Sequence, residues 1–583
     1  MRRFLFLLPL AALAADIAPD AYLAHVRYLA SPELKGRATG SPQLEKAAHY
    51  IAGQFRSYGL KPADGRNFEV AFPVALGAHM GNKNHLKFKD PDPAQPLAAG
   101  KDFLPLSFSS SGELNGPVVF AGYGVTDKKT GYDDYAGIDV TGKFVLILRH
   151  EPKENAHQEH VTFTDKAINA KMHGARGVIL VNDADRHEGA DDLGKFAAEG
   201  PRDAGVFFVR MKYALAEDWL KADGQDLHAI AKQIDADGHP HSFALTKLTV
   251  DLSVDVRTET KTVHNIAAYL PGETDEYVVV GAHYDHLGLG DEHSLAPAQI
   301  GTIHPGADDN ASGTAGVLEL ARWASKQPKQ RRGILFLSFA GEELGLLGSE
   351  WYVNHPVLPL AKAVAMINMD MIGRIREGKI YLSGTGTGST LPKLVEDVKP
   401  PAPLSIDMAE KAGYGSSDHT SFTTKGVPVL FFFSGLHGDY HKPSDTADKI
   451  DAVDAARLLD YIADLVTHLE NDPRPQYQRV AAPPQGPVGS GGGSGYGPAF
   501  GSIPDFNEPP KGVRFADVRD GTPAAKAGLK AGDILIEFDG KEIANLYDFT
   551  YALRSHKPGD LVLVKVLRGD RTIEAKVLLE ERR

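Results

Sequence analysis

The sequence contains no cysteine at any of its 583 positions. Disulfide bonds, thiolate zinc sites, cysteine nucleophiles and cysteine lipid anchors are therefore excluded. It also lacks an apolar run near the ~20 residues that a membrane-spanning helix needs. The net charge of -13 argues against nucleic acid or an anionic membrane surface as the main partner. What remains is a globular composition, with 42% hydrophobic and 24% charged residues.

Residues 1–15 have the three parts of a secretory signal peptide. Two arginines come first, the apolar stretch Phe4–Leu13 follows, and Ala12-Leu13-Ala14 offers a small-residue cleavage pattern. We therefore expect an exported protein, periplasmic or extracellular, with no integral membrane span after cleavage.

Two kinds of hydrophobic pattern divide the rest of the chain. Residues 76–254 hold short apolar runs between Gly-, Pro- and Asp-rich turns, which predicts a β-rich domain. Continuous apolar runs that alternate with helical patterns predict an α/β sandwich with a buried sheet. These runs are Tyr277–Gly281, Ile334–Ala340, Ala363–Asn368 and Val427–Phe433.

The predicted domain organisation follows from these patterns. We predict a discontinuous α/β domain over 16–75 and 255–472, with the β-rich segment inserted into it. Residues 473–496 are rich in Pro, Gly and Ser and predict a flexible linker. A small domain of short strands and one helix follows over 497–583.

Six metal-type residues follow the apolar runs or lie in nearby loops: His283, Asp308, Glu342, Glu343, Asp370 and His441. Each alone is explained by a structural role, but ligands of an open α/β sheet gather at the carboxyl ends of its strands. One zinc ion needs three protein ligands. Two zinc ions that share one carboxylate need five protein ligands. The sixth residue, Glu342, is then available as a general base.

The motifs around these residues resemble those of the co-catalytic zinc peptidases, the family of secreted bacterial leucyl aminopeptidases and glutamate carboxypeptidases. They are H-Y-D from His283, G-A-D-D-N-A-S-G from Gly306, A-G-E-E-L-G-L-L-G-S from Ala340, N-M-D-M-I-G from Asn368 and H-K-P-S-D-T from His441. The resemblance implies a mixed-sheet zinc-peptidase α/β sandwich.

The resemblance also implies the roles of individual residues. Asp308 would bridge two zinc ions, with a cis peptide bond to Asp309. The remaining ligands would be His283 and Asp370 at one ion, and Glu343 and His441 at the other. Glu342 would be the base that activates a water, and cobalt or manganese would be alternatives to zinc. Asp285 would orient His283.

Two tyrosines compete for stabilising the oxyanion of the transition state. Tyr414 resembles the residue that secreted aminopeptidases use, and Tyr440 resembles that of the carboxypeptidase branch. Tyr414 is the preferred candidate.

The two other domains resemble known modules. The insert, with V-V-F-A-G-Y-G from Val118, is similar to a protease-associated domain. The last domain, with G-T-P-A-A-K-A-G-L-K-A-G-D from Gly521, is similar to a PDZ domain. Such domains bind extended or C-terminal peptides by strand addition. The predicted binding loop contains Phe500, Gly501 and Ile503.

The sequence thus predicts an exported di-zinc metallopeptidase, an aminopeptidase acting on peptides or proteins with a free N-terminus. A carboxypeptidase of the same family would need basic residues to hold a substrate carboxylate. A glutaminyl cyclase keeps a single zinc ion, and an inactive binding protein on this scaffold should have lost ligands. The complete ligand set favours the enzyme.

Overall fold

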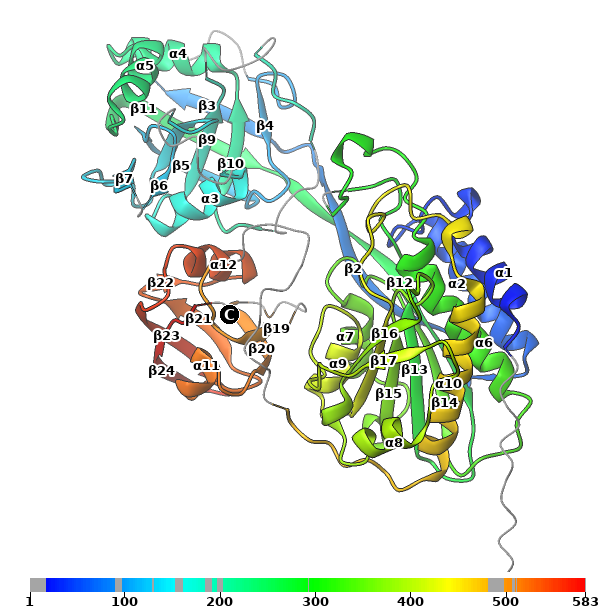
Figure 1. Ribbon diagram of the computed structural model, residues 1–583. Helices are drawn as coiled ribbons and strands as arrows, with labels where there is room; N and C mark the ends of the chain where they lie inside the picture. The colour runs from blue at the N-terminus through cyan, green and yellow to red at the C-terminus, as the bar shows by residue number, and fades with distance from the viewer. Residues whose placement is uncertain are drawn as a thin grey trace, which may run out of the picture.

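The computed structural model describes residues 17–89, 97–127, 130–152, 161–183, 191–196, 203–291, 293–480, 497–505, 509 and 511–581. The predicted signal peptide, and the linker from residue 481 on, lie outside these residues. The described residues form a nine-stranded, a seven-stranded and a six-stranded sheet, and a two-stranded sheet of β6 (Thr126–Asp127) and β7 (Tyr132–Asp133) (Figure 1). None of the helices in the described part of the chain is long and apolar enough to cross a bilayer.

Four parallel strands form the centre of the nine-stranded sheet, in the order β14 (Gly333–Phe339), β13 (Tyr277–His283), β15 (Ala363–Met369) and β18 (Val429–Phe433). Every residue of the first three is buried. They coincide with the apolar runs of the sequence, because a strand covered on both faces has no polar side. The predicted α/β sandwich is confirmed.

Helices cover both faces of this sheet, each over its own apolar core. One layer consists of α1 (Pro19–Leu29), α2 (Pro42–Ser57), α6 (Gly313–Ala324) and α10 (Ala452–Asn471). The other face carries α7 (Leu347–Asn354) and α9 (His419–Thr424), and α8 (Leu391–Asp397) packs near α10. The outer strands are β1 (Lys61–Pro62), β2 (Glu69–Met80), β12 (Val256–Leu270), β16 (Lys379–Ser383) and β17 (Ser405–Asp407).

The inserted domain contains more helix than its sequence pattern predicts. Its seven-stranded sheet contains the parallel strands β5 (Gly112–Phe120), β8 (Phe144–Leu148), β9 (Gly177–Val181) and β10 (Phe207–Met211), with β3 (His85–Lys89), β4 (Phe103–Pro105) and β11 (Phe243–Val254) outside them. One helical pattern is evident in the sequence, but the structure has α3 (Phe163–Met172), α4 (Tyr213–Ala222) and α5 (Leu227–Asp237). Parallel strands require crossover connections, which explains part of this helix content.

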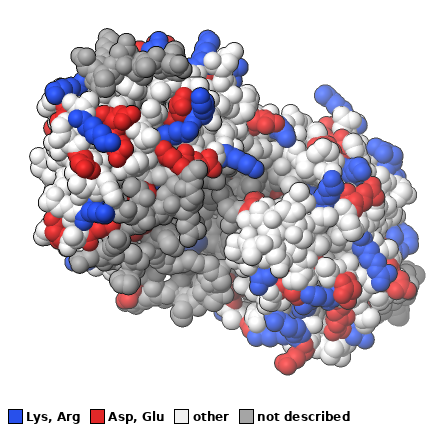
Figure 2. All heavy atoms as spheres, turned by 90° about the horizontal axis from the view of Figure 1, so that it is seen from above, with Lys and Arg blue, Asp and Glu red and all other residues white. Residues whose placement is uncertain are grey.

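The C-terminal domain has the strands β19 (Ser502–Pro504), β20 (Val513–Val518), β21 (Ile534–Phe538), β22 (Lys541–Glu542), β23 (Leu561–Arg568) and β24 (Arg571–Leu578), with α11 (Pro523–Lys526) and α12 (Leu546–Arg554). It docks on the insert through ion pairs of 2.7 Å from Lys171 to Asp548 and 2.6 Å from Arg554 to Asp165. Seen from above, a hollow separates the two lobes, and acidic and basic side chains are interspersed on this face (Figure 2).

Candidate metal centre

The carboxyl ends of the central strands bring the candidate residues together. His283 is the last residue of β13, and Asp370 directly follows β15. Glu342 and Glu343 lie in the loop after β14, and His441 lies in the loop after β18. Parallel strands end at the same edge of a sheet, so these loops converge there.

Two groups of ligand-type atoms form within this cluster. In the first, His283 Nε2 lies 3.4 Å from Asp309 Oδ1 and 3.4 Å from Asp370 Oδ1. In the second, His441 Nε2 lies 3.2 Å from Asp309 Oδ2 and 3.1 Å from Glu343 Oε2. Asp309 therefore directs one carboxylate oxygen to each group.

This geometry fits a pair of zinc ions. Ligand bonds of ~2.0–2.1 Å in a tetrahedral site place the ligand atoms about 3.3–3.4 Å apart, close to the spacings found here. His283 Nε2, Asp370 Oδ1 and His441 Nε2 are buried and have no hydrogen-bond partner. Buried polar atoms without a partner are costly, so a ligand such as a metal ion is expected at them.

The structure corrects the predicted bridging residue. Asp309, and not Asp308, belongs to the cluster. The Asp308 carboxylate instead accepts from Gly373 N at 2.7 Å and lies 3.2 Å from His437 Nε2. The cis peptide bond is likewise one residue later than expected, between Asp309 and Asn310.

Backbone contacts determine which of the two aspartates faces the centre. Asp445 Oδ2 accepts from the backbone N–H groups of Asp308 at 2.9 Å and Asp309 at 3.1 Å. Gly306 has a φ of 57°, which favours glycine and turns the chain into this segment. Neither contact can be read from two adjacent carboxylates in a sequence.

The cluster contains more carboxylates than histidines. Burial raises the pKa of Glu342 well above its ordinary value, and it also raises the pKa of Asp370. Burial alone would lower the pKa of His441, but the nearby carboxylates of Asp309 and Glu343 raise it to about 11. Divalent cations would neutralise this surplus of negative charge.

Two further residues hold the centre and were not predicted. His286 Nδ1 lies 2.6 Å from Glu343 Oε1, so it orients that carboxylate. Its signal in the sequence is its place in H-Y-D-H, three residues after His283. Arg37 is fully buried and donates to the carbonyls of Tyr284 at 2.8 Å and Gly306 at 3.0 Å, tying together the loops beside His283 and Asp309.

Asp285 supports Glu342 more directly than it supports His283. Its Oδ1 accepts from Glu342 N at 3.2 Å and lies 3.8 Å from His283 Nδ1. Its Oδ2 accepts from the Thr39 hydroxyl at 2.7 Å. The predicted contact with the histidine ring is therefore longer than a hydrogen bond.

The two tyrosines occupy different surroundings. The Tyr414 hydroxyl donates to Asp517 of the C-terminal domain, so the structure directs it away from the predicted oxyanion role. The Tyr440 ring stacks on His441 at 3.8 Å between centroids. Burial, followed by the charges of Asp309 and Glu343, raises the pKa of Tyr440, so its hydroxyl stays protonated. Tyr440 therefore contacts a candidate ligand, whereas the Tyr414 hydroxyl is bound to the C-terminal domain.

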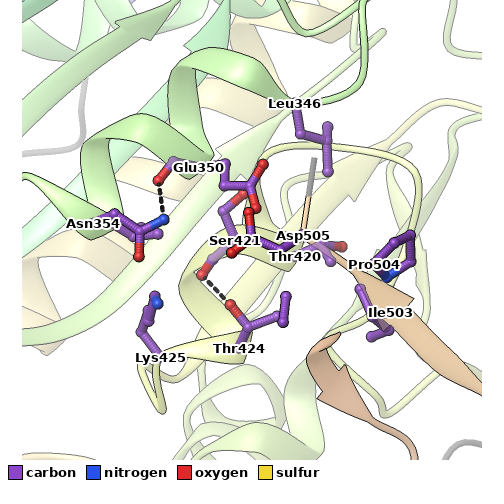
Figure 3. A pocket seen from close by; sticks show the side chains of 12 residues that line it. Leu346, Glu350, Asn354, Thr420, Ser421, Thr424, Lys425, Ile503, Pro504 and Asp505 are labelled. Atoms are coloured by element: carbon purple, nitrogen blue, oxygen red, sulfur yellow. Dashed lines mark hydrogen bonds between the residues drawn. The ribbon is translucent and has the colours of Figure 1, made fainter. Parts of the chain in front are cut away.

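The predicted peptide loop of the C-terminal domain is partly internal. Phe500 packs in the domain core, 5.1 Å from the Phe549 ring of α12. A Cβ at Gly501 would lie 2.2 Å from Thr522 Cβ, so only glycine fits. Ile503 of β19 lines a pocket between this domain and helices α7 and α9 (Figure 3).

Family models match three parts of the chain. Residues 265–466 match the model of peptidase family M28, residues 114–219 match the PA domain, and residues 497–579 match the PDZ domain. The α/β domain that contains residues 265–466 is called the M28 domain below, after this match. The predicted resemblance to the zinc peptidases, with protease-associated and PDZ domains, is confirmed.

Curated proteins that are similar to parts of this chain are named aminopeptidases. A probable leucine aminopeptidase of Arthroderma otae is 32% identical over 207 residues, 34% of this chain and 54% of that protein. Aminopeptidase YwaD of Bacillus subtilis is 27% identical over 386 residues, 64% of this chain and 70% of that protein. The chain thus spans about half of the length of several fungal relatives.

Two solved aminopeptidase structures are similar to this chain. The aminopeptidase from Aneurinibacillus sp. strain AM-1 has 24% identity and a TM-score of 0.45, covering 81% of this chain and 97% of that one. The zinc aminopeptidase from Bacillus subtilis has 21% identity and a TM-score of 0.45, covering 78% and 96%.

Proposed function

We propose that this protein is an exported di-zinc aminopeptidase that removes N-terminal residues from peptides. One observation carries the proposal: Asp309 directs its two oxygens to two separate histidine–carboxylate pairs. Such an arrangement suits two ions that share a bridging carboxylate. The names of the M28 relatives support the reaction, and the signal-peptide pattern of residues 1–15 supports export.

The residues divide the chemistry between them. His283, Asp309 and Asp370 would hold one ion, and His441, Asp309 and Glu343 the other. When bound, zinc would polarise the scissile carbonyl and lower the pKa of a water to about 7. Glu342 would take the proton of the attacking water and return it to the leaving amine. The Tyr440 hydroxyl would donate to the oxyanion.

Exposed leucines in the loops that carry the centre support substrates with apolar residues. Leu344 follows Glu343 directly and is 36% exposed, and Leu436 is 41% exposed in the loop that leads to His441. Leu295 is 43% exposed, and its backbone N–H donates to the carbonyl of His441 at 3.0 Å. An apolar rim of this kind would bind an aliphatic side chain of the substrate.

Two arginines near the centre give no support to a carboxypeptidase. The Arg37 guanidinium donates to backbone carbonyls. Arg374 forms an ion pair of 3.1 Å with Asp439. A free guanidinium facing the centre would be needed to hold a substrate carboxylate. The inactive-scaffold alternative is disfavoured because the ligand groups and the candidate base lie together.

The mature chain should hydrolyse free-amine peptides, and a chelator should stop it. Glu342→Gln should lower kcat by about 10²–10⁴-fold because it removes the general base. Zinc content, measured by elemental analysis, should not change. Hydrolysis of N-blocked peptides with a free carboxylate would instead identify a carboxypeptidase, and an unchanged kcat in the variant would remove Glu342 from the mechanism.

A further inference from the structure

Asp517 connects the PDZ domain to the M28 domain. It lies on β20 and is only 2% exposed. Its Oδ2 accepts from the Tyr414 hydroxyl of the M28 domain, and its Oδ1 accepts from Arg479 Nη2 at 2.8 Å. Both carboxylate oxygens of this PDZ residue are thus bound by groups outside the PDZ domain.

The backbone around Tyr414 is held rigidly to helix α9. Thr420 Oγ1 accepts from Gly415 N at 2.9 Å and donates to Gly415 O at 2.7 Å. Thr423 Oγ1 donates to Gly413 O at 2.7 Å. A displacement of Tyr414 would therefore be transmitted to the start of α9 rather than absorbed within the loop.

The same loop reaches the metal centre at Ser417. Its hydroxyl oxygen accepts from Asn368 Nδ2 at 2.9 Å, and Asn368 lies on β15 two positions before Asp370. Ser417 is fully buried, so water cannot readily replace this contact. Two residues of chain thus separate Tyr414, at the PDZ contact, from Ser417, which is bonded to the strand that leads to the candidate zinc ligand Asp370.

We propose that Asp517 of the PDZ domain is a positioning residue of the M28 centre, acting through Tyr414 and Ser417 on Asp370. This inference rests on the proposed metal role of Asp370. The PDZ domain is then a structural part of the peptidase site, and not only a tethered peptide-binding module.

The segment that enters the linker strengthens the same contact. Gln478 N donates to Thr387 O of the M28 domain at 2.8 Å, which anchors the chain before the linker. The next residue, Arg479, pairs with Asp517 and also with Asp520 at 2.9 Å. The Arg519 guanidinium lies 5.8 Å from the centroid of the Tyr414 ring. The docking of the two domains is therefore specific in charge and geometry.

The test uses the full chain and the variants Asp517→Ala, Tyr414→Phe and their combination. Zinc affinity is measured by competition with a chromogenic chelator, and kcat and KM are measured separately. Partners that orient a metal ligand typically contribute 10–100-fold to metal affinity or activity. We expect each single variant to lose zinc affinity and kcat by that factor, with KM little changed. The double variant should lose no more zinc affinity than Asp517→Ala alone.

Two variants serve as controls for a general structural effect. Asp520→Ala also loses a partner of Arg479, but its side chain is 50% exposed and pairs with Arg479 rather than Tyr414, so it should bind zinc like the wild type. Asp517→Asn keeps an oxygen acceptor for Tyr414 and should restore most of the affinity. Tyr414→Phe leaves the PDZ domain itself unchanged, so misfolding of that domain cannot account for its effect.

Wild-type zinc affinity in both Asp517→Ala and Tyr414→Phe would overturn the inference. Additive losses in the double variant would also overturn it, because residues acting through one contact are not independent. If the wild-type chain hydrolyses no peptide, the proposed function fails, but the shift in zinc affinity still reports on Asp517.

Discussion

At the scale of single residues, two adjacent aspartates have different environments. Asp309 lies between the two histidines of the centre, while Asp308 accepts from a backbone N–H and contacts His437. Both side chains are buried, so burial alone does not distinguish them. The distinction lies in which direction the backbone presents each carboxylate, and Asp445 fixes that direction through two hydrogen bonds.

This difference gives a matched pair of isosteric variants. Asp309→Asn should lower zinc affinity by more than the 10–100-fold typical of residues that only orient ligands, because it removes an anionic ligand itself. Asp308→Asn should bind zinc like the wild type, since an amide can still accept from Gly373 N. Elemental analysis after dialysis measures both. The reverse order of effects would restore Asp308 as the bridging ligand.

At the scale of elements, the apolar runs of the sequence predict the buried strands. No sequence pattern predicts that the end of α10 is buried. Glu470 lies in the last turn of α10 and is only 4% exposed. Burial raises its pKa from 4.5 to about 8. The folded protein therefore holds a proton on Glu470 that the unfolded chain releases at lower pH.

The stability of the wild-type protein should consequently fall as pH rises. The contribution of Glu470 is fully present below pH ~4.5 and is lost up to pH ~8, by at most about 1.4 kcal/mol per pH unit. Glu470→Gln should flatten this dependence and melt above the wild type at pH 8. Thermal melting between pH 5 and pH 8 measures it, with the exposed Glu396→Gln as control. Parallel melting curves for the wild type and Glu470→Gln would exclude the effect.

At the scale of the whole molecule, zinc should stabilise the M28 domain more than the PDZ domain. The M28 domain buries a surplus of carboxylates at its centre, while the PDZ core lies apart from it. Zinc at 100 times its Kd adds about 2.7 kcal/mol to the free energy of unfolding. For a domain of ~150–250 residues this raises Tm by roughly 5–10 °C.

Differential scanning calorimetry with zinc or with a chelator distinguishes these domains. The transition of the M28 domain should move with zinc, and the transition of the PDZ domain should move less, since it is linked to the centre through the contact at Asp517. A common shift of both transitions would mean that their docking makes them unfold as one unit. Equal curves with and without zinc would contradict a zinc site.

The sequence by itself determined the strands of the M28 sheet, the domain types and the positions in the chain of most residues at the centre. It could do so because burial on two faces imposes a continuous apolar pattern, and because strand ends carry the polar residues. Only the tertiary structure decided between Asp308 and Asp309, revealed His286 and Arg37, and bound Tyr414 to Asp517. These outcomes depend on the direction of side chains and on contacts between segments far apart in the chain, such as the 103 positions from Tyr414 to Asp517, which local patterns do not encode.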